Sequence, residues 1–481
     1  MKILLLRLPL VYGASSISRL LSPGGYLSSR LYCEWLVRYP PLGLLYYGSI
    51  LKKNDHSVKL IDGELTGISF NKLLLLAKEY NPDIILATVN IYNPRAEFDF
   101  LSKLKDSLGC FIAARGHFPQ LYPEESICNK GIDCALTGKG FNTIINLARA
   151  VEQHIPLEKI KGIIFKNNQD EIVKTGPEEP YAFNNLPHPA RELIDNAVYT
   201  TALTKNDLFT TITTSIGCPY SCTYCVDRHI PYQTRSIDNI IAEIRDCIDN
   251  FGIKEVTFLD STFTVDKTRT IQLCEAIIEQ GLKFKWAIRT RPDRVDNELL
   301  SLLAKAGCVS IHYGIESGDQ QILDNLKRNN TLKTIQQAIE MTSRNGLETL
   351  GFFMIGNTGE TPQTINNTIR FARSLPLDIA QFNVAFPVPP SNIYINSLKT
   401  LGQDIWLESY KGKEITAAMC KPQDTALAAE ELTYWAKKAY RSFYLRPGYF
   451  LRLAKYKYFP HILLRQFKLL LLHIKISFNR I

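Results

Sequence analysis

The chain lacks any long apolar run. A membrane-spanning helix needs about twenty consecutive apolar residues. The nearest approach in this 481-residue sequence is residues 462–478, which three cations and a histidine interrupt: Arg465, Lys468, His473 and Lys475. We therefore expect no transmembrane helix. The opening MKILLLRLPLVYG has one lysine and a short apolar run before Arg7, which is typical of a first buried strand rather than a signal peptide.

The chain also lacks the cysteine density of a disulfide scaffold. Its eleven cysteines are spread out, which predicts a cytoplasmic, reducing setting where grouped cysteines more often hold metal than form disulfides. A hydrophobic share of 45% and a charged share of 21% exclude a disordered chain. The eight histidines and the scattered acids form no paired-carboxylate or nucleophile arrangement. No catalytic side chain is therefore assigned.

Residues 441–481 contain no acidic residue. They hold nine lysines and arginines, which equals the net charge of +9 and leaves the rest of the chain formally neutral. From about Thr425 the sequence has helical spacing, and its end alternates leucine and phenylalanine with cations. Two interpretations stay open: a solvated basic helix packed on the protein, or an amphipathic helix on an anionic membrane surface. We favour peripheral contact with the inner face of the membrane. Nucleic acid is disfavoured, because the aromatic residues form no evident platform.

The first 150 residues alternate strand-like and helix-like runs. Strands are expected at KILLLRL, SVKLID, PDIILATVN, CFIAARG and DCALTG, with helices between them. This alternation predicts an α/β fold with a parallel, doubly wound sheet, whose ligands bind at the carboxyl ends of the strands. We place an N-terminal Rossmann-like domain at residues 1–150 and a linker with turns at residues 151–205.

A second alternating array spans residues 206–400. Its expected strands are FTTITTSI, KEVTFLD, KFKWAIRT, VSIHYGIES, LETLGFFMIG and DIAQFNVAF. Six strand–helix units form a partial (β/α)6 barrel of the TIM type more readily than a flat sheet, and periodicity leaves both arrangements open. Residues 401–481 are expected to form a helical C-terminal region that ends in the basic tail.

Three cysteines occur within the eleven residues SIGCPYSCTYC. Cys218, Cys222 and Cys225 follow a C-x3-C-x2-C spacing after the first strand of the second array, where an active-site loop of a barrel begins. Zinc sites usually take a second cysteine pair, and the sequence has no other C-x2-C. Three thiolates suit a [4Fe-4S] cluster whose fourth iron is open to a non-protein ligand. A zinc knuckle or chance spacing is the alternative.

This motif resembles that of the radical S-adenosylmethionine (SAM) superfamily. The resemblance implies that the open iron chelates the amino and carboxylate groups of SAM. It also implies that the reduced cluster cleaves SAM into methionine and a 5′-deoxyadenosyl radical. Tyr224, the aromatic residue before the third cysteine, would then pack near the adenine.

Three later segments also resemble the superfamily: FLDSTFT, YGIESG and GFFMIGNTGET. Arg289 in WAIRTRPD is a candidate cation for the SAM carboxylate. The resemblance implies SAM contacts from residues at the ends of expected strands: Asp260, Arg289, Glu316, Ser317, Gly351 and Gly356. Glu360 matches the last of these motifs. Ser261 stands where the family usually has a second carboxylate, which weakens a two-carboxylate site. The alternatives are tight turns and close packing for the glycines and an ion pair inside the barrel for Arg289 and Glu316.

The first array resembles the opening of cobalamin-binding radical SAM enzymes. The similar segments are YPPLGLLYYGSILKKNDHSVKLIDGE, ARGHFPQLYPEE, DCALTGKGFNTIINL and LPHPARELID, and with the barrel the resemblance covers about residues 1–400. It implies cobalamin at the carboxyl edge of the first sheet, near His117 or the early loop of residues 11–25. The Asp-x-His-x-x-Gly motif for an axial histidine is absent, so we expect no histidine on cobalt. Arg115 replaces a usual glycine, and a backbone-bonded turn histidine is the alternative for His117.

The resemblance implies a cobalamin-dependent radical SAM enzyme that methylates an unactivated carbon of a lipid-like or natural-product substrate, with flavodoxin or ferredoxin as reductant. Methylcobalamin, recharged by a second SAM, would deliver the methyl group. Three alternatives stay open: an oxidative cyclase or other non-methylating cobalamin enzyme, a tRNA methylthiotransferase, and a non-catalytic cobalamin or iron–sulfur sensor. The methylthiotransferase would carry a second cysteine triad, for which the remaining N-terminal cysteines are too scattered: Cys33, Cys110, Cys128 and Cys134.

Overall fold

The computed structural model describes residues 1–9, 38–66, 68–201, 203–204 and 208–449. The early loop of residues 11–25 and the tail beyond residue 449 lie outside these residues, so the expectations placed on them stay predictions. The described chain divides into two compact units. Among the described residues, the first comprises 1–9, 38–199 and Trp406–Glu414, and the second comprises Thr200–Ile405 and 415–449.

A seven-stranded sheet forms the centre of the first unit, in the order β2-β1-β3-β4-β5-β6-β7. Its strands are β1 (Lys2–Arg7), β2 (Ser57–Asp62), β3 (Ile84–Thr88), β4 (Phe111–Arg115), β5 (Cys134–Leu136), β6 (Ile163–Lys166) and β7 (Ile172–Lys174). Strands β1 to β5 run parallel, and β6 and β7 are antiparallel to their neighbours. This confirms the parallel, doubly wound arrangement predicted for the first array.

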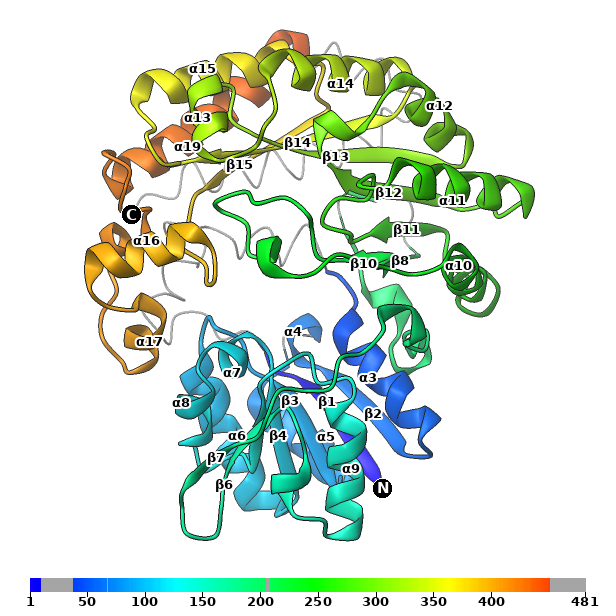
Figure 1. Ribbon diagram of the computed structural model, residues 1–481, viewed down its shortest axis with the longest axis vertical. Coiled ribbons are helices and arrows are strands. Elements are labelled where there is room, and N and C mark those ends of the chain that lie inside the picture. The colour runs from blue at the N-terminus through cyan, green and yellow to red at the C-terminus, as the bar shows by residue number, and fades with distance from the viewer. Residues whose placement is uncertain (10–37, 67, 202, 205–207, 450–481) are drawn as a thin grey trace. The chain divides into compact units, whose positions relative to one another are not determined.

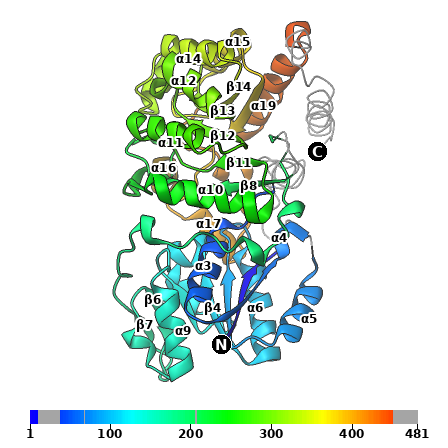
Figure 2. The same ribbon diagram turned by 90° about the vertical axis from the view of Figure 1, so that its right-hand side faces the viewer.

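The helices of the first unit cover both faces of the sheet (Figure 2). They are α3 (Leu42–Lys53), α4 (Gly63–Thr66), α5 (Phe70–Tyr80), α6 (Pro94–Leu108), α7 (His117–Leu121), α8 (Pro123–Ile127), α9 (Thr143–Gln153) and α17 (Ile405–Tyr410). Helix α3 contacts α9 on one face, and α5 contacts α6 on the other. Because both faces are covered, β1 and β3 are buried on both sides and read as unbroken apolar runs. The strand order reverses between β1 and β3, which is where a doubly wound sheet opens a ligand crevice.

Strands β6 and β7 lie in the segment that the sequence assigns to a linker. They form a hairpin at the edge of the first sheet, where Cys134 of β5 pairs with Phe165 and Phe165 pairs with Val173. The Asn167 side chain caps the turn by accepting hydrogen bonds from the backbone N–H groups of Gln169 and Glu171. Strands of three or four residues carry too short an alternation to be recognised in sequence.

A six-stranded parallel sheet forms the centre of the second unit, in the order β15-β14-β13-β12-β11-β8. Its strands are β8 (Phe209–Ile212), β11 (Glu255–Phe258), β12 (Lys285–Thr290), β13 (Cys308–Glu316), β14 (Glu348–Ile355) and β15 (Ile379–Val384). All six coincide with the strands predicted for the second array. Strands β8 and β15 are the two edges, so the sheet is the predicted partial barrel, open between them.

The helices of the second unit pack along one side of its sheet (Figure 1). They are α10 (Ile237–Phe251), α11 (Lys267–Glu279), α12 (Asn297–Lys305), α13 (Gln320–Asn325), α14 (Leu332–Arg344), α15 (Pro362–Ser374) and α19 (Ala429–Tyr444), while α16 (Asn392–Leu401) and α18 (Ala417–Cys420) follow β15. The core between helices and sheet is apolar and includes Phe258, Trp286 and Phe353. No helix among the described residues is long and apolar enough to cross a membrane.

Helix α19 covers the edge strand β15 and forms the predicted helical C-terminal element. The Tyr444 hydroxyl accepts a hydrogen bond from the backbone N–H of Ala380 at 3.1 Å and donates one to its carbonyl at 2.9 Å. Tyr449 donates from its hydroxyl to the Asp378 carbonyl at 2.9 Å. Side chains thus satisfy polar groups of an edge strand that would otherwise be open to pairing.

Candidate functional site

The three cysteines lie on one loop after the first strand of the second sheet. A two-stranded ribbon of β9 (Ser215–Ile216) and β10 (Gln233–Thr234) closes the base of this loop. Gly217 begins it with φ +73°, and a Cβ there would overlap the carbonyl oxygens of Ile230 and Pro231. Only glycine combines this conformation with such close backbone approach.

Each cysteine sulfur has a different polar neighbour. Cys218 Sγ lies 3.7 Å from the Thr262 hydroxyl, and a backbone N–H at Asp227 approaches Cys225. Cys222 is 5% exposed, and two guanidinium groups reach its Sγ: Arg328 Nη1 at 3.6 Å and Arg291 Nη1 at 3.8 Å. Hydrogen bonds and positive charge at a sulfur favour its thiolate form, which is the form that binds metal.

The cysteine side chains are not already arranged around a common point. Within the described ranges, no three His, Cys, Asp or Glu side chains are grouped closely enough to hold a metal ion. Burial raises the pKa of the Cys225 thiol to about 11. All three cysteines are free thiols. Three thiols on one short loop, with two buried cations beside one of them, are a donor set that fits an anionic iron–sulfur cluster.

Tyr224, predicted to lie near a cofactor, joins the cysteine loop to strand β13. Its hydroxyl donates to Glu316 Oε1 at 2.8 Å and accepts from Arg328 Nη1 at 3.2 Å. Burial raises the pKa of Tyr224 well above its ordinary value. Burial also raises the pKa of Glu316, while Arg328 and the Tyr224 hydroxyl oppose the shift. Glu316 has φ +71°, a backbone strain that is common at functional sites.

Asp260 accepts hydrogen bonds from the segment that precedes the cysteines. Its carboxylate accepts from the Thr214 backbone N–H at 2.7 Å, from the Thr214 hydroxyl, and from the Ser215 hydroxyl at 2.7 Å. The side chain is 1% exposed. Asp260 therefore anchors the approach to the cysteine loop, and a direct SAM contact from it stays a prediction.

Ser317, Gly351 and Gly356 also have local structural roles. The Ser317 hydroxyl forms a hydrogen bond with Thr368 Oγ1 at 3.0 Å. A Cβ at Gly351 would crowd Ile315 and Leu377 in the core. Gly356 has φ +95°, and its N–H donates to the carboxylate of Glu360. These contacts are those of tight turns and close packing, and their predicted contacts with SAM are still to be tested.

Some buried polar atoms near the carboxyl ends of these strands have no hydrogen-bond partner among the described residues. They are Nε of Arg289 at the end of β12, Oδ1 of Asn357 after β14, and Nε and Nη1 of Arg228 in the cysteine loop. A buried polar atom without a partner is costly unless a ligand or water satisfies it. These atoms are therefore available to a polar ligand at this edge of the sheet.

In the first unit, His117 follows β4 and begins α7. It comes after Gly116, whose φ of +117° and close approach to the Val89 carbonyl exclude a side chain. The His117 side chain is exposed. Although the residue is exposed, neighbouring atoms partly desolvate its ring and lower its pKa, and the positive charges of Arg115 and Lys139 lower it further. Arg115, where the family usually has glycine, places its guanidinium 5.1 Å from the centre of the Tyr47 ring.

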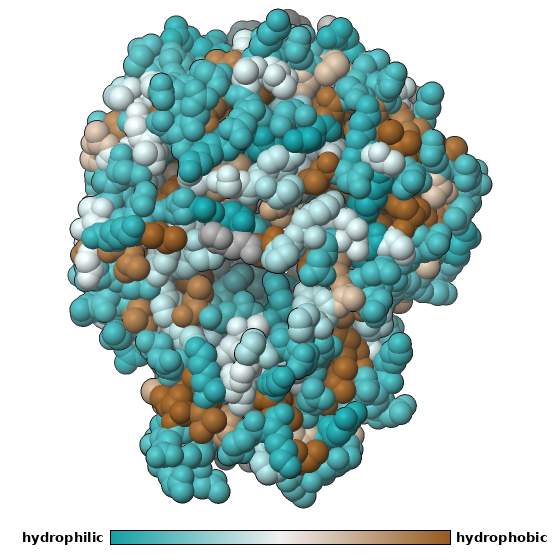
Figure 3. Space-filling view, in the orientation of Figure 1, coloured by the Kyte–Doolittle hydropathy of each residue, from teal (hydrophilic) through white to brown (hydrophobic). Residues whose placement is uncertain are grey.

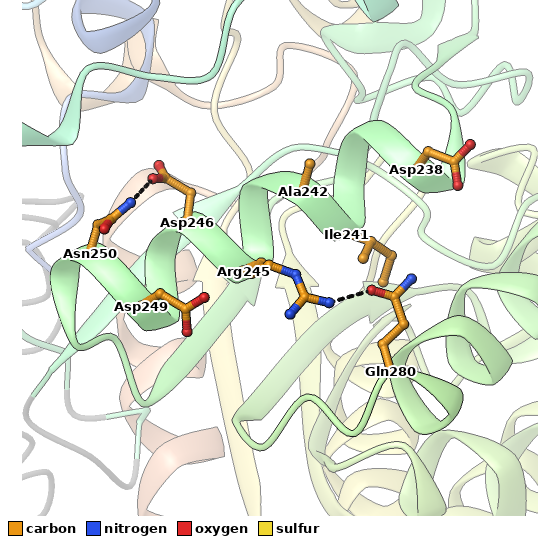
Figure 4. A pocket seen from close by; sticks show the side chains of 8 residues that line it. All are labelled: Asp238, Ile241, Ala242, Arg245, Asp246, Asp249, Asn250 and Gln280. Carbon is orange, nitrogen blue, oxygen red and sulfur yellow. Dashed lines mark hydrogen bonds between the residues drawn. The ribbon is translucent and has the colours of Figure 1, made fainter.

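A surface hollow lies elsewhere, on the outer side of α10 near the end of α11 (Figure 4). Arg245 Nη2 donates to Gln280 Oε1 at 2.6 Å across it, and Asn250 donates to Asp246 at 2.7 Å. None of the residues of the predicted site lines it. The hollow therefore carries no sign of the predicted chemistry. On the face seen in Figure 3, hydrophobic residues are interspersed with hydrophilic ones.

Arg291 and Arg328 are the residues that sequence reasoning missed. The prediction placed a cation at Arg289, two positions before Arg291. Arg291 lies over the ring of Tyr220 at 4.0 Å and contacts Cys222, so it touches the cysteine loop twice. The only signal in the sequence was the repeated arginine of WAIRTRPD.

Comparison with known proteins agrees with this geometry. The family model of the radical SAM superfamily matches residues 212–372. An uncharacterized methyltransferase of Pyrococcus horikoshii is 28% identical over 422 residues, 85% of this chain and 88% of its own length. The anaerobic magnesium-protoporphyrin IX monomethyl ester cyclase of Cereibacter sphaeroides is 25% identical over 431 residues, 86% of this chain and 68% of its own.

The fold is similar to that of the radical S-adenosylmethionine methyltransferase TsrM of Kitasatospora setae, solved with cobalamin and a [4Fe-4S] cluster. The TM-score is 0.63 at 17% identity, over 83% of this chain and 75% of that one. The family match covers the barrel with its cysteine loop, and the structural match extends over the doubly wound unit before it. The barrel with its cysteine loop therefore matches a radical SAM domain, and the fold of the chain is similar to that of a solved radical SAM methyltransferase that binds cobalamin.

Proposed function

We propose that the chain is a cobalamin-dependent radical SAM methyltransferase that adds a methyl group to an unactivated carbon of a small molecule. The observation that carries the proposal is the loop of Cys218, Cys222 and Cys225, with two buried arginines at Cys222, on the first strand of a parallel six-stranded sheet. The methyltransferase similarity over 85% of the chain supports the transfer of a methyl group.

The cofactors would supply the difficult chemistry. The cluster would provide the electron for SAM cleavage, and cobalamin would carry the methyl group. The three cysteines would hold the cluster. The unpartnered Arg289 Nε offers a positive donor for the SAM carboxylate, and the Asn357 Oδ1 offers an acceptor. Cobalamin would lie at the carboxyl edge of the first sheet, where the strand order reverses and where His117 follows β4.

A ring-forming reaction is the second candidate. The observation that favours it is the similarity of the Cereibacter cyclase over 86% of this chain. A lipid-like substrate and peripheral membrane contact through the basic tail remain sequence predictions, because residues 450–481 lie outside the described chain.

The test is anaerobic reconstitution with iron and sulfide, followed by SAM, cobalamin and dithionite. We expect about four irons per chain, 5′-deoxyadenosine, and S-adenosylhomocysteine only when cobalamin is present. Cys222→Ala should lose the cluster and both products, since one of three thiolate ligands is gone. Cys128→Ala, which changes an exposed cysteine of the first unit, is the matched control and should keep them.

Two results would contradict the proposal. Wild-type protein that takes up stoichiometric zinc and no iron would make the triplet a structural metal site. An intact cluster that yields 5′-deoxyadenosine but no S-adenosylhomocysteine with any candidate substrate would favour the cyclase reaction.

A further inference from the structure

Cys222 differs from the other two cysteines in the charge beside it. Cys218 has a neutral hydroxyl and Cys225 a backbone N–H as neighbour, whereas Cys222 has the guanidinium groups of Arg328 and Arg291. Both arginines are only 4% exposed. Water therefore screens their charges poorly, and their electrostatic effect on the sulfur is strong.

Both guanidinium groups are fixed in place by further contacts. Arg291 donates to the Asp293 carboxylate at 2.9 and 3.1 Å, to Asn330 Oδ1 at 3.0 Å, and to the backbone carbonyl of Arg328. Arg328 donates to the Tyr224 hydroxyl at 3.2 Å and to the Gly314 carbonyl. The Arg291 side chain thus holds the backbone of Arg328, and each guanidinium group directs one nitrogen at the same sulfur.

Two acids lie beside this pair and offset part of its charge, but the groups that point at the Cys222 sulfur are the arginine nitrogens, at 3.6 and 3.8 Å. Asp293 is paired with Arg291. The Glu316 carboxylate accepts a hydrogen bond from the Tyr224 hydroxyl and interacts electrostatically with Arg328. Burial disfavours its ionised form. Burial opposes the charge on Arg328, but Tyr224, Glu316 and Cys222 hold its pKa above the ordinary value, so it stays a cation.

We propose that Arg328 and Arg291 are positioning residues that raise the reduction potential of the cluster by placing positive charge at the Cys222 sulfur. This rests on the proposed function, because it requires a cluster at the three cysteines. Reduction adds one electron, and hence one negative charge, to the cluster. Fixed cations beside a ligand sulfur stabilise that charge, so the reduced form is favoured.

The test is a redox titration of the reconstituted protein, with dithionite as the one-electron reductant and the reduced cluster followed by electron paramagnetic resonance. We expect Arg328→Gln to lower the ratio of reduced to oxidised cluster about tenfold at a fixed ambient potential, a shift of about 59 mV toward negative values for one electron. Arg291→Gln should shift the ratio in the same direction. Arg328→Lys keeps the charge and should recover most of the loss.

The matched control is Arg344→Gln on α14, whose side chain is 72% exposed, and it should leave the ratio unchanged. The proposal is overturned if Arg328→Gln and Arg291→Gln bind full iron and keep the wild-type ratio. It is also overturned if Lys at position 328 behaves as Gln does, because geometry rather than charge would then matter. If both Gln variants fold but bind no iron, the arginines hold the cysteine loop and the claim about the potential is wrong.

Failure of the proposed function is distinguishable from failure of this inference. Wild-type protein without iron would refute the cluster itself. If the wild-type protein holds a cluster and its reduction potential is unchanged in both Gln variants, only the electrostatic role is refuted.

Discussion

Gly217 is the residue at which the cysteine loop leaves β9. Its left-handed backbone and its closeness to two carbonyl oxygens of the returning chain let the loop close over a narrow base. A side chain at this position would have to push apart the β9–β10 ribbon. The geometry of the cysteines therefore depends on a residue that cannot bind metal.

We predict that Gly217→Ala lowers the free energy of unfolding by about 2 kcal/mol or more, from backbone strain plus the overlap of Cβ with backbone. Gly252→Ala is the matched control, because Gly252 also has positive φ, +62°, but an added methyl group there would meet no atom within 4 Å. It should cost only about 1 kcal/mol. Chemical denaturation measures both, and equal losses would contradict the role given to the close approach.

At this scale, sequence reasoning finds what is local. Cys218, Cys222 and Cys225 are recognised because their spacing lies within eight residues. Arg291 and Arg328 are 69 and 106 residues from Cys222. No spacing in the sequence predicts that both arginines contact the Cys222 sulfur. The prediction named Arg289 for a different role, contact with the SAM carboxylate, and that role stays a prediction.

Among the elements, the edge strand β15 depends on a side chain from α19. A buried hydroxyl that both donates to and accepts from one residue of the strand satisfies two backbone groups at once, and their burial would otherwise be costly. Helix α19 is therefore part of the second sheet's stability rather than an appendage.

We predict that Tyr444→Phe lowers the free energy of unfolding by about 1–3 kcal/mol, because the Ala380 N–H and carbonyl lose their partner. Tyr434→Phe on the same helix removes a hydroxyl from a side chain that is 59% exposed and should change stability little. Thermal or chemical unfolding of the two variants measures the difference. A loss of similar size in both would contradict the bridging role.

The elements themselves were largely predictable. Five strands of the first sheet and six of the second carry apolar runs separated by amphipathic helices, and this alternation is a strong signal. Strands β6 and β7 were missed because tertiary pairing with β5, rather than their own sequence, makes them strands.

At the scale of the whole molecule, the first unit is not built from one continuous stretch of chain. Residues Trp406–Glu414 belong to it, although they follow the barrel strands in sequence. Tyr410 packs its ring 4.7 Å from that of Phe118 and 6.4 Å from that of Phe98. Its hydroxyl accepts from the Asn129 side chain at 2.9 Å. The short helix α17 gave no sign of this in the sequence, because six residues carry no usable periodicity.

We predict that Tyr410→Ala destabilises the first unit by about 3 kcal/mol, the typical cost of truncating a packed aromatic side chain. Hydrogen exchange should speed up in α7 and α8 and stay unchanged in β12 and β13 of the second unit. Tyr434→Ala, at an exposed position, is the control. Exchange that speeds up equally in both units, or in neither, would contradict the assignment of this segment.

The discontinuous first unit also has a consequence for how the protein is made. A ribosome that has completed Tyr199 must add 206 more residues (405 − 199) before Trp406 emerges behind them. At ordinary speeds of translation this takes roughly 10–40 s. During that interval the nascent first unit presents Phe98 and Phe118 without the tyrosine that covers them, so its last folding step waits on synthesis of the entire barrel.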